Sequence, residues 1–169
     1  MYIKTFELYR LPYKDPHPER IIPRFTGSTI EIMDKYKQIS PDKSIVNFVR
    51  NSAKDFSQNL EIEILKYPQL LNGYQYSNAL YGYGAPWYAS KLGDIVVNFD
   101  YSVIDRSWGG FREHYIDKHY MARIMCLEDE YYFVTLLRTG LNNSDRAMDN
   151  FLISDRDDFD NLFYTFKNL

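Results

Sequence analysis

Regular alternation of apolar and polar residues is the main structural signal along this chain. Between residues 95 and 103 every odd-numbered residue is apolar or aromatic, and residues 60–64 read Leu-Glu-Ile-Glu-Ile. A period of two residues is typical of a half-buried strand. Further strands are predicted at residues 2–9, 120–127, 131–137 and 150–153. The segments 120–127 and 131–137 flank a short acidic sequence and should pair as a hairpin.

Two helices are predicted between the strands at residues 2–9 and 60–64. Ser28 and Glu31 have the spacing of a capping box, which starts a helix. Its apolar stripe is expected to be Ile32, Met33, Tyr36 and Ile39. Ser40 is expected to cap a second helix with Pro41 at its first position, because the missing proline N–H has no helical partner there. This helix should run to about residue 53, with Ile45, Phe48 and Val49 facing the core.

A third, amphipathic helix is predicted at the C-terminus. Ser154 is expected to cap it, with Asp157 at the third position. Its apolar residues are Phe159, Leu162, Phe163 and Phe166. Strands outnumber helices and do not alternate with them, which favours a single α+β domain over residues 1–169. We expect a mainly antiparallel sheet of about five to six strands, two short helices after the first strand, and the C-terminal amphipathic helix.

The aromatic composition points to one segment. Aromatic residues make up 17% of the chain, and six of the 16 tyrosines fall between residues 67 and 88, outside any periodic pattern. An AT-rich genome would raise the tyrosine total but would not cluster the tyrosines. Tyrosine and tryptophan dominate binding hot spots. The predicted partner-binding residues are Tyr74, Tyr76, Tyr81, Tyr83, Trp87, Tyr88 and Trp108. The alternative is that these rings fold back as a satellite core.

Charge and cysteine content narrow the class of protein. The net charge is −3 and no basic stripe is visible, which makes duplex DNA an unlikely partner. Cys126 is the single cysteine and lies among apolar residues, so we expect an inert buried thiol. No apolar run has the length of a membrane span or a signal peptide. These features predict a cytoplasmic protein without membrane contact, and they predict no cofactor or metal. The oligomeric state stays open.

The densest group of reactive residues lies in the second half of the chain. Arg112, His114, Asp117 and His119 include two of the three histidines. Such a set could act as acid, base and charge stabiliser in cleaving a phosphodiester. However, residues 111–119 fit either a strand or a helix, and neither geometry brings both histidines together. The spacing of His114, Asp117 and His119 is also not that of a standard metal site.

The sequence is therefore compatible with three functions. The first is a non-enzymatic protein-binding module, a small inhibitor or adaptor of a phage or bacterium, acting through the aromatic segment at residues 73–88. The second is a small hydrolase or nuclease using Arg112, His114, Asp117 and His119. The third is a protein that sequesters a nucleotide or single-stranded nucleic acid by stacking bases on tyrosine. Another protein is the partner that the composition favours.

Overall fold

The computed structural model describes residues 20–27, 29–54, 59–67, 69, 89–104, 115–139 and 147–168. Within these ranges, side chains are described except at residues 101–104, 115–119, 138–139 and 147–148. The predicted strand at residues 2–9 lies outside the described residues. So does Ser28, the predicted cap of the first helix.

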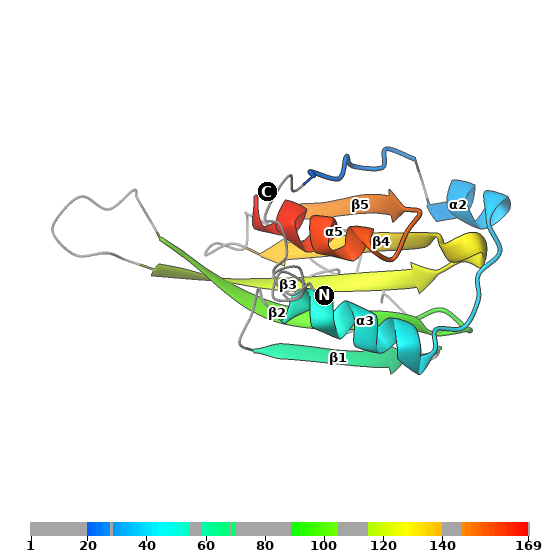
Figure 1. Ribbon diagram of the computed structural model, residues 1–169, viewed down its shortest axis with the longest axis horizontal. Helices are drawn as coiled ribbons and strands as arrows, with labels where there is room; N and C mark the ends of the chain where they lie inside the picture. Colours follow the sequence, from blue (N-terminus) through cyan, green and yellow to red (C-terminus); the bar gives the residue numbers. More distant parts are fainter. Residues whose placement is uncertain are drawn as a thin grey trace, which may run out of the picture.

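The described strands form one antiparallel sheet in which each strand pairs with its neighbour in the chain (Figure 1). They are β1 (Leu60–Leu65), β2 (Asp94–Ile104), β3 (Tyr115–Cys126), β4 (Tyr132–Thr139) and β5 (Ala147–Ile153). The predicted hairpin is confirmed, with Ile124 opposite Val134. Residues 115–119, for which the sequence was compatible with either a strand or a helix, form part of strand β3.

Three α-helices and a short 3₁₀ turn complete the described elements. The helices are α2 (Thr29–Lys35), α3 (Lys43–Ala53) and α5 (Asp158–Lys167), and the 3₁₀ turn η1 (Glu128–Glu130) joins β3 to β4. Together with the antiparallel sheet they confirm the predicted α+β class, including two short helices and a C-terminal amphipathic one. Within the described residues, no helix combines the length and apolar character needed to cross a membrane.

Helices α3 and α5 cover one face of the sheet (Figure 1). Ile95, Val97 and Phe99 of β2 pack there, as their alternation predicts, and Phe99 contacts Tyr120, Phe163 and Phe166 with ring centroids 5.2–6.3 Å apart. The buried side of α5 is formed by Phe159, Leu162, Phe163 and Phe166, the residues that the sequence predicts. Full burial of one such side chain contributes about 1.5–3 kcal/mol, so this helix is central to the fold.

The opposite face of the sheet is also apolar over much of its area. Val96, Met121 and Leu137 pack with Leu65 and Ala89 near β1. A second cluster, near the β3–β4 turn, contains Ile32, Met125, Leu127 and Phe133. Strict alternation places Val96 on a polar face, whereas this residue is fully buried.

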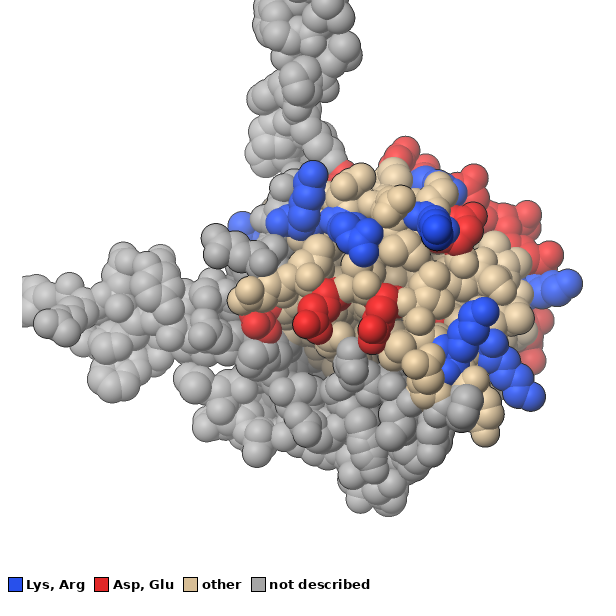
Figure 2. Space-filling view, turned by 90° about the horizontal axis from the view of Figure 1, so that it is seen from below, with Lys and Arg blue, Asp and Glu red and all other residues tan. Residues whose placement is uncertain are grey.

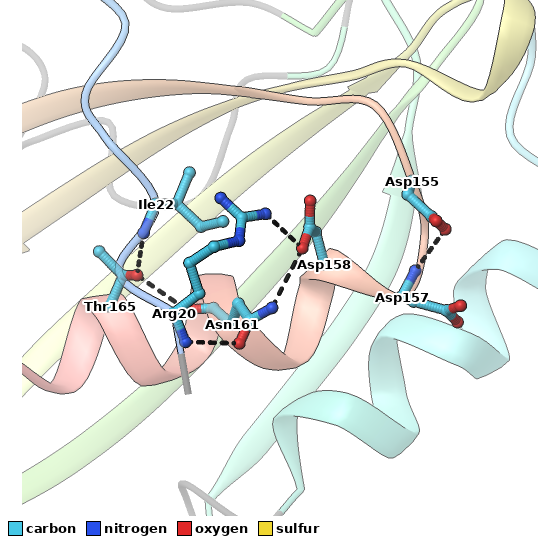
Figure 3. Close-up of polar contacts among 7 residues, drawn as sticks. All are labelled: Arg20, Ile22, Asp155, Asp157, Asp158, Asn161 and Thr165. Carbon is cyan, nitrogen blue, oxygen red and sulfur yellow. Dashed lines mark hydrogen bonds and ion pairs between the residues drawn. The ribbon is translucent and has the colours of Figure 1, made fainter. Parts of the chain in front are cut away.

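The chain preceding β1 wraps around the sheet. Residues 20–22 lie on α5, where Arg20 pairs with Asp158 and the Ile22 N–H donates to Thr165 Oγ1 at 2.8 Å (Figure 3). The Phe25 N–H then donates to the Asn150 carbonyl on edge strand β5 at 2.7 Å. The Phe25 ring packs against Phe133, on the face away from α5.

After α2 the chain returns to the first face around the β3–β4 turn. Gln38 forms a β-bridge with Leu127, and the Ile39 N–H donates to the Cys126 carbonyl at 2.9 Å. This pairing corrects the predicted extent of the first helix. Helix α2 ends at Lys35, and Ile39, predicted to lie on its apolar stripe, is extended and exposed. Met33, from the same stripe, is exposed as well.

The predicted caps of the other two helices are also corrected. Asp42, and not Ser40, is the N-cap of α3, because its carboxylate accepts from the Ile45 N–H at 3.0 Å. Pro41 therefore precedes the helix. At α5 the side chain that turns the chain is Asp155, which accepts from the Asp157 N–H at 2.9 Å, so the prediction of Ser154 as cap is wrong. In both cases a carboxylate supplies a charged acceptor for the free N–H groups.

Candidate functional site at the ends of β1 and β2

Backbone hydrogen bonds join the end of β1 to the segment that leads into β2. We call these two stretches, residues 64–69 and 89–94, the base. The Tyr67 N–H donates to the Ser90 carbonyl at 3.0 Å, and the Ala89 N–H donates to the Gln69 carbonyl at 3.0 Å. The Gly93 N–H donates to the same Ser90 carbonyl at 3.2 Å. Gly93 has φ +104°, a conformation that L side chains rarely adopt. A glycine is therefore required where the chain turns into β2.

A polar cluster lies beneath this base. Asp94 is 0% exposed, and its carboxylate accepts from the Ser90 N–H at 2.8 Å and from the Ser90 hydroxyl at 3.0 Å. The same hydroxyl accepts from Gln38 Nε2 at 2.6 Å. Arg123 on β3 places its Nε 3.7 Å from Asp94 Oδ2 and balances the buried charge. The four residues connect three separate parts of the chain.

Three large apolar side chains are exposed around the base. Ile64 is 36% exposed, Tyr67 54% and Leu92 41%. We call these three residues the anchor surface. Ile64 and the stem of Lys66 both lie close to Gly93, with their nearest atoms 3.2 and 3.3 Å from where a β-carbon would be. Exposed apolar side chains on one hydrogen-bonded segment are a feature of protein-binding surfaces.

Six of the predicted partner-binding residues belong to the chain between the two sides of this base. Tyr74, Tyr76, Tyr81, Tyr83, Trp87 and Tyr88 lie outside the described residues, which end at Gln69 and resume at Ala89. Tyr67, from the same tyrosine cluster, is described and exposed. Ile64 and Leu92 were not predicted as site residues, because Ile64 continues an ordinary strand alternation and Leu92 stands alone in a polar sequence.

Trp108, the seventh predicted partner-binding residue, belongs to the connection between β2 and β3. It too lies outside the described residues. This connection leaves from the far end of β2, whose 11 residues span about 35 Å. The base at residues 64–69 and 89–94 and the start of the Trp108 connection are thus at opposite ends of the sheet, and the two predictions need separate tests.

Two of the four predicted catalytic residues lie in the part of the chain that the structure describes. Arg112 and His114 lie outside the described residues, while Asp117 and His119 belong to β3. The ladder pairs His119 with Asp100 on β2 and Asp117 with Ser102. Asp100 lines an open pocket of about 430 Å³ together with Asn59, Leu60, Glu61, Asn98 and Phe99. The pairing of Asp100 with His119 could not be predicted from the sequence, since the register depends on how β2 and β3 align.

A smaller cavity, of about 90 Å³, lies between the start of α3 and the β3–β4 turn. Cys126, Tyr132 and Arg156 line it, and Arg156 Nε lies 3.3 Å from the Glu130 carboxylate. Burial raises the pKa of Cys126 to about 12 and also raises the pKa of Tyr132. A protonated thiol is a poor nucleophile, so this cavity has the character of a structural pocket.

No group of three or more metal-ligating side chains occurs among the described residues. Comparison of the chain with protein-family models, curated proteins and solved structures finds no match. The geometry of the anchor surface is therefore the main basis for assigning a function.

Proposed function

We propose that this chain is a non-enzymatic protein-binding module, acting as an inhibitor or adaptor, which holds its partner through the anchor surface and the aromatic residues 74–88. The observation that carries the proposal is that Ile64, Tyr67 and Leu92, which all belong to or directly adjoin the hydrogen-bonded residues at the ends of β1 and β2, are exposed. Isolated exposed apolar residues are ordinary on protein surfaces, whereas several together mark an interaction site.

The chemistry of this surface favours a protein over a nucleic acid. Ile64 and Leu92 are aliphatic and offer nothing to a phosphate or to a base edge. Lys66 and Lys91 are exposed beside them, which supplies a small basic rim. On the face shown in Figure 2 a row of acidic side chains lies between two groups of basic ones, so charges of both signs are present there. A binder of duplex DNA would need a continuous basic stripe.

The bonded base supports the same function energetically. Ordering a loop on binding opposes association, and each immobilised side chain adds about 0.5–1.5 kcal/mol to that cost. The hydrogen bonds of Tyr67, Ala89 and Gly93 hold the anchor surface in place before a partner arrives. A surface fixed in advance loses less entropy on binding.

Quantitative capture from a host extract tests the proposal. Wild-type protein is compared with Leu92→Ser and with the control Met33→Ser on α2, since both residues are 41% exposed. We expect a protein partner that is depleted about tenfold by Leu92→Ser, the effect of a hot-spot residue, and retained by Met33→Ser. Alanine at Tyr81, Tyr83 or Trp87 should weaken the same capture while folding is preserved.

Two results would contradict the proposal. Equal capture by wild type and Leu92→Ser would exclude the anchor surface from binding. Recovery of a nuclease-sensitive ligand in place of a protein would instead support the function of sequestering a single-stranded nucleic acid, with Tyr67 as a stacking platform.

One specific observation favours a second candidate function. The pairing of His119 with Asp100, which lines the open pocket, supports a small hydrolase or nuclease that also uses Arg112, His114 and Asp117. Hydrolysis of labelled RNA that is lost in His119→Ala but kept in His17→Ala would support it. Equal activity in both variants would remove His119 from the chemistry.

A further inference from the structure

We infer that Gln38, Ser90, Asp94 and Arg123 form a latch that fixes the anchor surface from a distant part of the chain. Gln38 belongs to the connection between α2 and α3, and Arg123 belongs to β3. Ser90 lies just before β2, and Asp94 is the first residue of that strand. The latch itself stands on the contacts of these residues. Only its consequence for partner binding rests on the proposed function.

Gln38 is held in place independently of the anchor surface. Its backbone bridges to Leu127, while the flanking Ile39 N–H donates to the Cys126 carbonyl and the Glu128 N–H donates to the Lys37 carbonyl, both at 2.9 Å. From this position its amide group donates to Ser90 Oγ at 2.6 Å and to the Gly93 carbonyl at 3.4 Å. The side chain therefore ties the β3–β4 turn to the start of β2.

Ser90 is the central residue of the latch, because its polar atoms contact both sides of the base. Its hydroxyl accepts from Gln38 and donates to Asp94, and its N–H donates to Asp94 as well. Its carbonyl accepts from the Tyr67 N–H and the Gly93 N–H. The positions of Tyr67 and Leu92, two of the three anchor residues, thus depend on the position of Ser90.

The buried charge explains why a latch of this kind is specific. The side chain of Asp94 is fully buried and that of Arg123 is 11% exposed. Removing a carboxylate from water is costly unless it is paired and hydrogen-bonded. Asp94 receives two hydrogen bonds from Ser90 and the positive charge of Arg123. Any conformation that displaces Ser90 leaves this carboxylate with fewer donors, so alternative positions of residues 89–93 are disfavoured.

Opening the latch should weaken the binding of a partner, although no residue that contacts the partner has been removed. If only the latched protein binds, the apparent Kd rises by the inverse of the latched fraction. A variant that is latched one tenth of the time would bind about tenfold more weakly. Gln38 would then be a positioning residue, acting through Ser90.

Amide hydrogen exchange measures the latch directly and needs no partner. Ser90→Ala removes the hydroxyl, and Gln38→Met keeps the length of the side chain but removes its donor. We expect exchange at Tyr67, residue 90 and Gly93 to become at least tenfold faster in both variants, and Ser90→Thr to restore it. Exchange at Ile39, in the connection between α2 and α3, and at Glu128, in the β3–β4 turn, should stay as in the wild type.

Thr165→Val is the matched control for these variants. Thr165 is buried on α5, which covers the other face of the sheet, and its hydroxyl accepts from the Ile22 N–H at 2.8 Å and donates to the Asn161 carbonyl at 2.7 Å. This variant should leave exchange at Tyr67 and Gly93 unchanged, even where it lowers global stability as much as Ser90→Ala. Faster exchange at those amides in Thr165→Val, or unchanged exchange in both latch variants, would overturn the latch.

Capture of the partner by the same variants separates the two proposals. Faster exchange with reduced capture supports the latch and its role in binding. Faster exchange with unchanged capture supports the latch and contradicts the anchor surface as the binding site. Unchanged exchange in Gln38→Met and Ser90→Ala contradicts the latch, whatever the capture shows for Leu92→Ser.

Discussion

Cys126 is the residue whose chemistry the fold changes most clearly. It ends β3 and is 2% exposed, and its pKa rises from 9.0 to about 12. Burial is the largest cause, and the negative charges of Asp42 and Asp94 add to it. The sequence predicted an inert core thiol from the apolar neighbours alone, and the burial agrees with that prediction.

The raised pKa of Cys126 links its protonation to stability. Because the folded protein holds the proton more tightly than the unfolded chain, this contribution is fully present below about pH 9 and is lost as the pH rises toward 12. We expect the free energy of unfolding in urea to fall above pH 9, with a slope of up to about 1.4 kcal/mol per pH unit from this thiol. Cys126→Ala should flatten that slope.

Tyr132 adds a further alkaline dependence, since burial raises its pKa too. A residual slope is therefore expected in Cys126→Ala. An unchanged slope in this variant would show that the thiol does not contribute. Reaction of native Cys126 with a thiol reagent at pH 8, at the rate seen in denaturant, would contradict its burial.

At the scale of the elements, α3 and α5 begin in different ways. Asp42 has an extended backbone, with φ −115° and ψ 176°, and its side chain accepts from the Ile45 N–H. Asp157 occupies the corresponding position of α5 but makes no side-chain cap bond. Both helices thus have an aspartate at the N-cap, but only the N-cap aspartate of α3 makes the side-chain hydrogen bond.

Alanine substitution of these two aspartates isolates the contribution of the cap. We expect Asp42→Ala to lower the free energy of unfolding by about 1 kcal/mol, the usual value of an N-cap bond. Asp157→Ala loses only a favourable charge near the helix start and should change stability by about 0.5 kcal/mol or less. Urea denaturation at neutral pH measures both. Equal losses would mean that the Asp42 bond adds nothing beyond charge.

At the scale of the whole molecule, residues 20–25, which wrap around the sheet before α2, are attached to it and to α5 by a few long-range contacts. The buried Ile22 N–H donates to Thr165 Oγ1 at 2.8 Å, while the Arg20–Asp158 pair lies near the surface (Figure 3). An unsatisfied buried donor costs about 1–3 kcal/mol, whereas an exposed ion pair contributes about 0–1 kcal/mol.

Two substitutions on α5 compare these contacts. Thr165→Val keeps the shape of the side chain but leaves the Ile22 N–H without its acceptor, and should destabilise the protein by about 1–3 kcal/mol. Asp158→Asn weakens the ion pair and should cost under about 1 kcal/mol. Thermal unfolding of the two variants measures the difference. A larger loss in Asp158→Asn would reverse the assignment of which contact holds the segment.

The fold could be predicted from the sequence wherever local periodicity decides. Alternation located β1 and β2, and the spacing of Phe159, Phe163 and Phe166 located α5, because these patterns reflect one buried face of a single element. Contacts between distant segments have no such signature. The bridge of Gln38 to Leu127 straightens the chain that the sequence assigned to a helix, and tertiary pairing here overrides local propensity.

Of the candidate site, the sequence could indicate only the general location. Clustered tyrosines pointed to the chain between Tyr67 and Tyr88, and the base that carries this chain includes the exposed Tyr67. The exposure of Ile64 and Leu92 and the burial of Asp94 depend on how β1 and β2 end together. An aspartate at the start of a strand looks like a surface residue until its partners Ser90 and Arg123 are brought to it.

The sequential order of the sheet also has a kinetic consequence. Pairing β3 with β4 requires closing only residues 127–131, whereas pairing β1 with β2 requires closing residues 66–93. The entropy of the longer closure is less favourable by about 1.5 kcal/mol. We expect the folding nucleus to contain the β3–β4 hairpin, with β1 joining after the transition state. Mutations in β1 would then chiefly accelerate unfolding, while mutations in the hairpin would slow folding.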